Sequence, residues 1–294
     1  MSEARHTIGA VTSNETNPAL SETPTLDGVS AEHEAFAAAW TRWHDAHEAR
    51  RADPHGFLAI TSITWLYDEP QEIDGIPGRW LAEGDRPVVE LAPGESLEVG
   101  GETVGGRHEF GPVDEAGIIA RSGDVDIEIA LRGDTVIVRP RDPRAPYLAT
   151  YPGTPAYLPD PKFAVQARFE AYDEPRDVTI GSVVEGLESV DRSPGELAFT
   201  VGGVPQRLVA FNGATPGSLR VLFTDVTSGV TTYAATRTLD VPAPAADGSV
   251  VVDFNRATNL PCAYTDFATC PLPPASNHLS VAIEAGEKMP LSRV

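Results

Sequence analysis

Hydrophobic residues recur at helical spacing near the start of the chain and at strand spacing after it. Phe36, Trp40 and Trp43 lie three or four positions apart, which places them on one face of a helix. The sequence DPHG at residues 53–56 is a typical signal for the end of a helix. The pattern therefore predicts one amphipathic helix over residues 30–51, with a serine as its N-cap.

Beyond this helix the pattern is that of short strands. Residues 57–67, FLAITSITWLY, combine β-branched and aromatic side chains, and FAVQARFEAY alternates between apolar and polar positions. VDIEIAL and TVIVRP flank a short turn, and LEVGGETVGG contains another, so each predicts a hairpin. Further predicted strands are DVTIGSVV, ELAFTVGG, QRLVAF, SLRVLFTD, TTYAATRTL, SVVVDFN and HLSVAIEA. We therefore expect a mainly β protein with antiparallel sandwich or barrel-like sheets and one N-terminal amphipathic helix.

Prolines and polar stretches divide the chain into four predicted parts. Residues 1–29 are polar and acidic without apolar periodicity, which predicts a disordered tail. The helix and the first strands form an N-terminal β unit over residues 30–140. A proline-rich connector over 141–162 leads to a C-terminal β unit over 163–294, which contains both cysteines.

The formal net charge of −21 limits the partners of this chain. It repels phosphate backbones and anionic lipid headgroups, so we expect neither nucleic acid nor membrane as a partner. Only Lys162 and Lys288 accompany twenty arginines, an acidic composition that resembles proteins of salt-loving archaea and predicts a halophilic protein. The chain lacks an apolar run near the ~20 residues that span a bilayer, so a cytoplasmic protein is expected. The oligomeric state stays open.

Two histidines lie close together on the predicted helix. His44 and His47 are three positions apart, beside Asp45 and Glu48, and one helical face could in principle hold a metal ion through them. The same residues are typical of the solvated face of a charged helix. We adopt that interpretation, and no metal site is assigned.

The C-terminal third carries polar side chains at predicted strand ends, where functional sites tend to form. Asp225 and Asp253 each close a strand. Tyr233 and Arg237 lie four positions apart on a third strand and so share a face. If neighbouring strands bring Asp225, Asp253 and Arg237 together, the arginine keeps both carboxylates ionised. These three residues are the candidate catalytic groups.

The same region resembles a known family. TDVTSGVTTYAATRTL, VVDFNRATNLPCAYTDFATCPLPPASNHL and AIEAGEK are similar to the motifs of domain-of-unknown-function family 1684, which is bacterial and archaeal and carries no known activity. The likeness is strongest over residues 223–288, and the chain departs from the usual residues at Thr258, Leu260 and His278. By this resemblance the recurring positions are Asp225, Thr227, Tyr233, Arg237, Asp253, Asn255, Arg256, Asn259, Cys262, Cys270, Pro271, Pro273, Asn277 and Glu287.

Both cysteines, Cys262 and Cys270, lie in one proline-rich loop. A disulfide there would stabilise the fold by roughly 2–3 kcal/mol, but a reducing cytosol opposes it. The thiols could instead bind zinc together with His278, or be buried and reduced small apolar residues. We favour the buried thiols.

Asparagines surround this loop. Their side-chain amides can pair with backbone groups that the rigid, proline-rich segment leaves without partners. They also contribute to the predicted ligand site. The predicted ligand-binding residues are Tyr233, Arg237, Asp253, Asn255, Asn259 and Asn277.

Two functions from different classes fit this pattern. The first is a protein that binds or acts on a small, anionic molecule in a pocket lined by the 255–277 loop, with Arg237 holding the anion and the aspartates acting as acid, base or hydroxyl acceptor. The alternative is a structural or interaction module in which the same residues form a buried network, or a metal-dependent hydrolase. The sequence lacks a nucleophile elbow, a zincin motif and a dinucleotide fingerprint. It therefore assigns no reaction and no cofactor, and whether the protein is an enzyme stays open.

Overall fold

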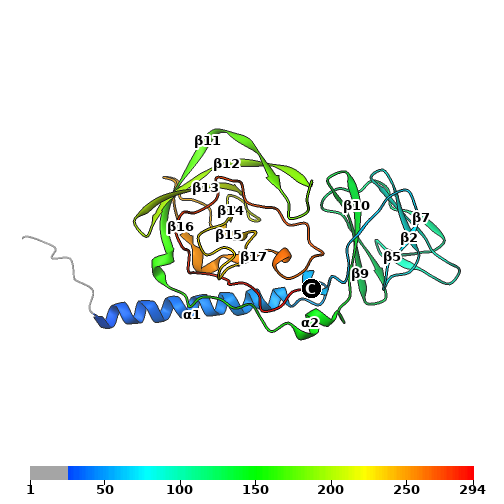
Figure 1. Cartoon of the computed structure of the whole chain (residues 1–294), viewed down its shortest axis with the longest axis horizontal. Coiled ribbons are helices and arrows are strands. Elements are labelled where there is room, and N and C mark those ends of the chain that lie inside the picture. The colour runs from blue at the N-terminus through cyan, green and yellow to red at the C-terminus, as the bar shows by residue number, and fades with distance from the viewer. Residues whose placement is uncertain (1–25) are drawn as a thin grey trace, which may run out of the picture.

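The computed structural model describes residues 26–294, and most of the tail predicted over residues 1–29 lies outside them. Helix α1 (Leu26–Arg51) runs beneath the C-terminal sheet (Figure 1). It begins at Leu26, so the predicted start at residue 30 was four residues too late, and residues 26–29 belong to the helix. Half-buried side chains recur every three or four positions from Phe36 to Arg51, which confirms the predicted amphipathic character.

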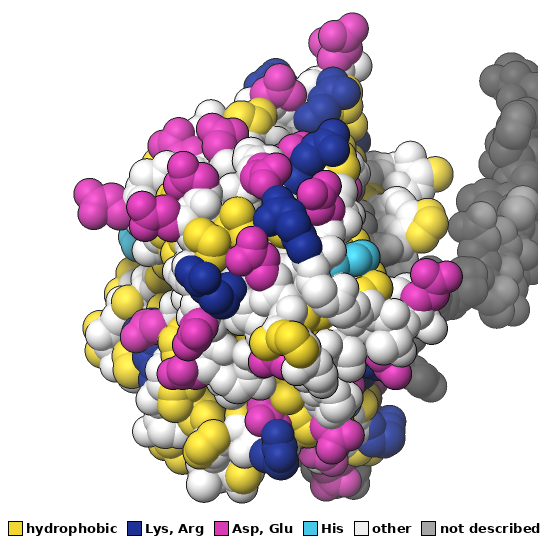
Figure 2. Space-filling view, turned by 90° about the vertical axis from the view of Figure 1, so that its right-hand side faces the viewer, with side chains coloured by type: hydrophobic (Ala, Val, Ile, Leu, Met, Phe, Trp, Pro, Cys, Tyr) yellow, Lys and Arg dark blue, Asp and Glu magenta, His cyan; other side chains and the backbone are white. Residues whose placement is uncertain are grey.

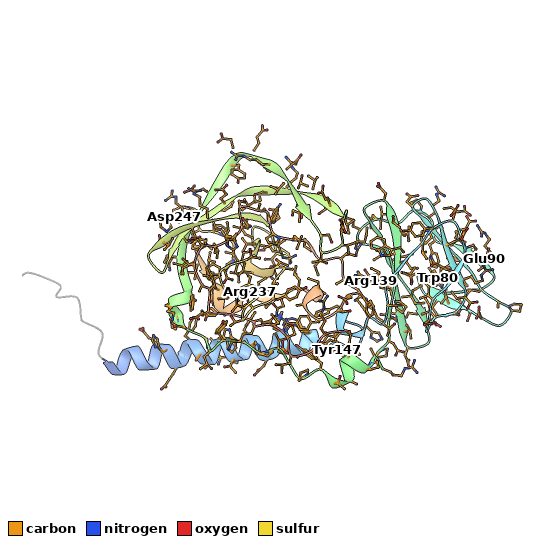
Figure 3. All side chains as sticks on the ribbon, in the orientation of Figure 1. Trp80, Glu90, Arg139, Tyr147, Arg237 and Asp247 are labelled. Carbon is orange, nitrogen blue, oxygen red and sulfur yellow. The ribbon has the colours of Figure 1, made fainter. Side chains whose placement is uncertain are left out.

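Two antiparallel sheets follow the helix. Their strand orders are β1-β10-β9-β8-β5-β6 and β2-β3-β4-β7. The bounds of the larger sheet are β1 (Thr64–Trp65), β5 (Leu97–Val99), β6 (Glu102–Val104), β8 (Ile118–Ser122), β9 (Val125–Arg132) and β10 (Thr135–Arg141). Those of the smaller are β2 (Gln71–Glu72), β3 (Arg79–Glu83), β4 (Arg86–Glu90) and β7 (Arg107–Glu109). Trp80 of one sheet and Ile127 of the other belong to one buried cluster, so the sheets share a core (Figure 3).

The two predicted hairpins of this region are confirmed. β9 and β10 pair from Arg132 and Thr135 outward, and β5 pairs with β6. Residues 57–67 differ from the prediction, because a 3₁₀ turn, η1 (Phe57–Ala59), occupies their start and only Thr64–Trp65 forms a strand. The turn buries Leu58 at 1% exposure, so tertiary packing outweighs the β propensity of this segment.

The predicted proline-rich connector contains two short helical segments, α2 (Pro146–Thr150) and η2 (Pro161–Phe163). Its tyrosines hold it against the rest of the chain. Tyr147 is buried, and its hydroxyl donates to the carbonyl of Ser292 at 2.7 Å. Packing therefore orders the connector, although most of it lies outside helices and strands.

The C-terminal half forms a single seven-stranded antiparallel sheet in the order β16-β11-β12-β13-β14-β15-β17. The bounds are β11 (Ala164–Gly181), β12 (Glu188–Val201), β13 (Val204–Asn212), β14 (Leu219–Phe223), β15 (Arg237–Val241), β16 (Ser249–Asp253) and β17 (Thr258–Asn259). The open sheet curls round its own core, which contains Phe223 and Phe254 (Figure 1). The short 3₁₀ turns η3 (Phe254–Arg256) and η4 (Pro261–Ala263) follow β16 and β17.

The predicted fold class is confirmed, because 42% of the chain is strand and 14% is helical. Within the described residues, no strand of the N-terminal sheets is hydrogen-bonded into the C-terminal sheet. None of the described helices has the length and apolar character that crossing a membrane requires. On the face in Figure 2, basic side chains run from the top through the centre beside acidic ones, and further acidic side chains gather at the upper left.

Candidate functional site

Arg237 and Asp225 form a fully buried ion pair inside the C-terminal sheet (Figure 3). Arg237 begins β15, directly opposite the end of β14, and Asp225 lies two residues beyond that end. The Arg237 Nη2 and Asp225 Oδ2 atoms are 2.7 Å apart, and both side chains have 0% exposure. The prediction that these two residues meet is confirmed.

The Arg237–Asp225 pair supplies hydrogen-bond partners to backbone groups of residues 283–285. The guanidinium donates to the carbonyls of Ala285 at 2.5 Å and Ile283 at 3.1 Å. The second oxygen of Asp225, Oδ1, accepts from the Ile283 N–H at 3.2 Å. The segment HLSVAIEA was predicted to be a strand and is not one. Its first half makes backbone bonds to Thr224 and Val226, and in its second half two side chains take the place of a neighbouring strand.

Burial strongly affects the charge of Arg237. It lowers the pKa of the guanidinium, and the neighbouring Asp225 carboxylate opposes this effect. A buried charge of this kind is tolerated only when it is paired and hydrogen-bonded, which is the arrangement found here.

Asp253 does not join this pair, so that part of the predicted site was wrong. Its Oδ1 accepts from the backbone N–H of Asn255 at 3.2 Å and from the Asn255 amide at 2.8 Å. Its Oδ2 lies 3.3 Å from Nε of Arg256. Asp253 therefore caps the 3₁₀ turn that follows β16 instead of facing Arg237.

Two asparagines act as hydrogen-bond partners for the backbone of distant segments. Asn277 accepts from the N–H of Val209 at 2.8 Å and donates to the carbonyls of Val209 at 2.9 Å and Leu222 at 2.8 Å. Asn255 accepts from the N–H of Asp160 at 2.8 Å and donates to its carbonyl at 2.9 Å. An amide offers the same donor and acceptor as a peptide group, so the predicted role of these side chains is confirmed.

Asn259 connects the ion pair to a second group of polar residues. Its side-chain amide donates to the carbonyl of Lys288 at 2.8 Å, and its backbone N–H donates to Oε2 of Glu287 at 2.7 Å. Asn259 also pairs with Arg237 across β15 and β17. Within the described residues, Oδ1 of Asn259 and Nε of Arg237 are buried without a hydrogen-bond partner.

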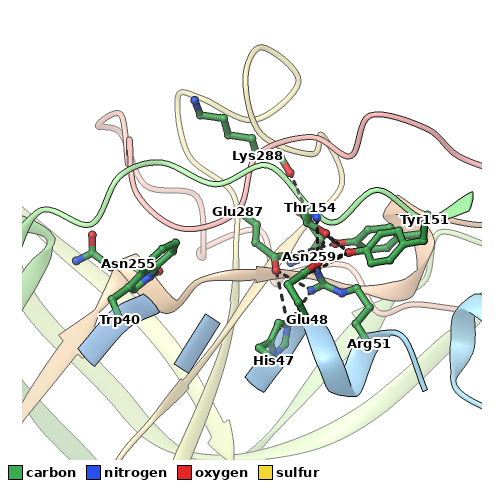
Figure 4. A network of polar contacts seen from close by, with 11 residues as sticks. Trp40, His47, Glu48, Arg51, Tyr151, Thr154, Asn255, Asn259, Glu287 and Lys288 are labelled. Carbon is green, nitrogen blue, oxygen red and sulfur yellow. Dashed lines mark hydrogen bonds and ion pairs between the residues drawn. The ribbon is translucent and has the colours of Figure 1, made fainter. Parts of the chain in front are cut away.

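Glu287 links the C-terminal sheet to helix α1, as Figure 4 shows. Its Oε1 accepts from Nη2 of Arg51 at 2.7 Å, and its Oε2 also accepts from the Tyr264 hydroxyl at 3.3 Å. The residue is 1% exposed. The preceding Gly286 has φ +74°, and a Cβ there would lie 2.5 Å from the carbonyl oxygen of Ala257, so glycine is needed to bring Glu287 into this position.

Arg51 is the cation at the centre of this second group of polar residues, to which Glu287 belongs. Its Nη1 donates to Oε1 of Glu48 at 2.5 Å and to Oγ1 of Thr154 at 2.5 Å. The other Glu48 oxygen accepts from the Tyr151 hydroxyl at 2.8 Å and the Thr154 N–H at 3.0 Å. The connector, the helix and the end of the sheet therefore meet around one guanidinium group.

Burial shifts the pKa values of the residues around Arg51 in different directions. It raises the pKa of Glu287, although Arg51 opposes the shift. It also acts to lower the pKa of Arg51, but the Glu287 carboxylate overrides this and raises it. Burial lowers the pKa of His47 to about 4, with Arg51 adding to the effect, so His47 is neutral at pH 7.

The cysteine loop packs beside this network. Cys262 and Cys270 are free thiols, both buried, and the Cys262 N–H donates to Sγ of Cys270 at 3.1 Å. The predicted burial of both thiols is confirmed. The hydroxyl of Tyr233, a predicted ligand residue, donates to the Cys262 carbonyl at 2.9 Å, and burial raises the pKa of Tyr233 to about 12.

The residues of this network that lie outside the C-terminal third were not among the predicted site residues, although Glu48 was noted beside His44 and His47. Arg51, Glu48 and Thr154 carry no motif, and Arg51 is 236 positions away from Glu287. The one usable signal was Glu287 itself, since it stands among the recurring family positions. A cleft of about 280 Å³ lies elsewhere, between Arg132 and Pro271. Thr269 and Pro271 of the 255–277 loop line it, but none of the six predicted ligand-binding residues does.

Comparison with known proteins gives a family but no activity. The model of a family described as "Protein of unknown function (DUF1684)" matches residues 149–288. Over these residues the chain belongs to the DUF1684 family. The matched region includes all the predicted site residues and Glu287, and it leaves α1 and the N-terminal sheets outside. The DUF1684 description names neither a ligand nor a reaction.

Among solved structures, the following one resembles part of the chain. It is the solution NMR structure of an uncharacterised protein of Haloarcula marismortui, which is 30% identical, covers 48% of this chain and 79% of its own, and superposes with a TM-score of 0.41. No curated protein matches the chain.

Proposed function

We propose that this chain is a structural scaffold module, in which the recurring DUF1684 residues hold the fold together instead of binding a substrate. The observation that carries this proposal is the environment of Arg237. Its terminal nitrogens are used by one aspartate and by backbone carbonyls of residues 283–287. An arginine that recognises a ligand needs free donors directed at an accessible space, and Arg237 is 0% exposed.

The asparagines support the same function. Asn255 and Asn277 each use both ends of the amide on backbone groups of distant segments. Both N–H donors of each amide are committed, so neither side chain has a donor left with which to select an anionic ligand. The demand for particular residues at these positions then follows from folding alone, because a buried polar group without its partner is costly.

The proposal predicts that breaking the buried pair destabilises the protein. Asp225→Asn leaves the Arg237 charge uncompensated and should lower the free energy of unfolding by about 3–5 kcal/mol. The matched control is Asp240→Asn, which breaks the exposed Arg220–Asp240 pair between the same two strands. That variant should change the free energy by less than about 1 kcal/mol, measured by urea unfolding.

Binding of a small molecule is the second candidate function, and one observation favours it. Nε of Arg237 and Oδ1 of Asn259 face the interior from paired positions, and neither has a partner among the described residues. A buried donor and acceptor of this kind suit a water molecule or a small polar guest. Native mass spectrometry of gently purified protein distinguishes the two functions. A retained small molecule that disappears in an Asp225→Asn variant of unchanged stability would overturn the scaffold proposal.

A further inference from the structure

Three metal-binding side chains converge where α1 meets the end of the C-terminal sheet. His44 and Glu48 lie four positions apart and therefore on one face of the helix. Glu287 approaches from the opposite side, held there by Gly286 and Asn259. One ligand atom from each of the three residues lies within 4.8 Å of the other two. We propose that His44, Glu48 and Glu287 form a site for one divalent transition-metal ion.

The state of His44 supports this proposal independently of the carboxylates. Its Nε2 atom is buried and has no hydrogen-bond partner among the described residues. The imidazole ring stacks on Trp40 with centroids 4.6 Å apart and an interplanar angle of 18°, so the ring has a defined orientation. The residue was expected on a solvated helix face, but it is partly buried. A buried ring nitrogen without a partner carries a desolvation cost that a metal ion would remove.

The presence of Arg51 is compatible with an ion. Arg51 already contacts Oε1 of Glu48 and Oε1 of Glu287, which leaves one net negative charge on the two carboxylates and the guanidinium. A carboxylate has about four acceptor positions, so each can bind a metal ion while it keeps its contact with Arg51. Outer hydrogen bonds of this kind orient metal-binding carboxylates in known sites.

The ligand set determines the class of ion. One imidazole and two carboxylates are ligands typical of Zn²⁺ and Mn²⁺, whereas Mg²⁺ and Ca²⁺ prefer oxygen alone. Bonds of about 2.0–2.2 Å to zinc place tetrahedral ligand atoms roughly 3.3–3.6 Å apart. The present spacing of up to 4.8 Å therefore requires a small inward movement of the side chains. Because that movement draws α1 toward Glu287, binding should raise the melting temperature.

The test uses the full chain, stripped with EDTA and then titrated with ZnCl₂ and, separately, MnCl₂ by isothermal calorimetry. We expect one equivalent of ion to bind and the melting temperature to rise. His44→Ala should weaken binding at least tenfold, and Glu48→Gln, which keeps the side-chain size, should do the same. The matched control is His33→Ala, an exposed histidine on the same helix, which should bind as the wild type does.

Two results would overturn the site. One is wild-type protein that binds neither ion at millimolar concentration. The other is binding that persists unchanged in both His44→Ala and Glu48→Gln, since the ion would then lie elsewhere. Circular dichroism of each metal-free variant establishes that it is folded. Neither result bears on the buried Asp225–Arg237 pair, so the scaffold proposal is tested separately.

Discussion

At the scale of single residues, side chains of this protein hydrogen-bond to buried backbone groups that a neighbouring strand would satisfy in a regular sheet. Arg237 and Asp225 bind the carbonyls and the N–H of residues 283–285, and Asn277 binds the N–H and carbonyl of Val209. Each contact replaces one that a neighbouring strand would supply. Such residues are hard to substitute, because only a group with the same donors and acceptors satisfies the buried backbone.

Asn277 offers the clearest test at this scale. Asn277→Ala removes three hydrogen bonds and leaves buried backbone groups without partners, so we expect a loss of about 3 kcal/mol in the free energy of unfolding. Asn212→Ala, at an exposed position at the end of β13, should cost less than about 0.5 kcal/mol. Equal stability of the two variants in urea would contradict the role assigned to Asn277.

At the scale of elements, the hairpins were predictable from the sequence. A segment whose backbone is hydrogen-bonded by side chains was not. The β9–β10 and β5–β6 hairpins carry their own turn signals, and both form as predicted. HLSVAIEA alternates like a strand but does not form one. Its first half makes backbone bonds to Thr224 and Val226, and its second half binds the side chains of Arg237 and Asp225. Alternation reports which residues are buried, and it does not report what satisfies the backbone.

The candidate site was also predictable only in part. The meeting of Asp225 with Arg237 and the amide contacts of the asparagines followed from local sequence. Asp253 was misplaced because its carboxylate reaches the nearby Asn255 amide, a local contact that strand geometry ignores. The pairing of Arg51 with Glu287 was missed because long-range pairing leaves no periodic signal in a single sequence, and Glu48 was noted only as a neighbour of His44 and His47 on the helix.

The attachment of α1 to the sheet can be tested at the same scale. Arg51→Met leaves the buried Glu287 carboxylate without its cation and should cost about 3–5 kcal/mol in the free energy of unfolding. Arg50→Met, one position earlier and exposed, should cost less than about 0.5 kcal/mol. Thermal unfolding of both variants gives the comparison, and a similar melting temperature for the two would mean that the Arg51 contacts contribute little.

At the scale of the whole molecule, one carboxylate anchors the contact between the N-terminal sheets and the cysteine loop. Glu128 of β9 pairs with Arg139 and Arg141 and lies 3.3 Å from Arg132. Arg139 in turn donates to the carbonyl of Phe267, and Arg132 donates to the Thr269 hydroxyl. Glu128 therefore orders the arginines that hold the two halves of the chain together.

This arrangement makes stability depend on pH. Burial acts to raise the pKa of Glu128, but hydrogen bonds from Arg139 and Arg141 outweigh it and hold the pKa below its ordinary value of 4.5. The contribution of Glu128 is therefore complete above pH 4.5 and is lost as the pH falls through the lower folded-state pKa.

Glu128→Gln should consequently lose more stability relative to wild type at pH 7 than at pH 3. Urea unfolding at the two pH values measures this, with Glu98→Gln, at an exposed position of β5, as the control that should show little difference at either pH. A Glu128→Gln penalty that stays constant from pH 7 to pH 3 would contradict the assignment.

The contact between Arg51 and Glu287 joins positions that are 236 residues apart. A ribosome adds about 5–20 residues per second, so roughly 10–50 s separate the synthesis of these two side chains. During that interval α1 has no buried carboxylate to dock against, and its tryptophans stay exposed to solvent and to other nascent chains. The newly made protein should therefore depend on holding chaperones until its final segment emerges.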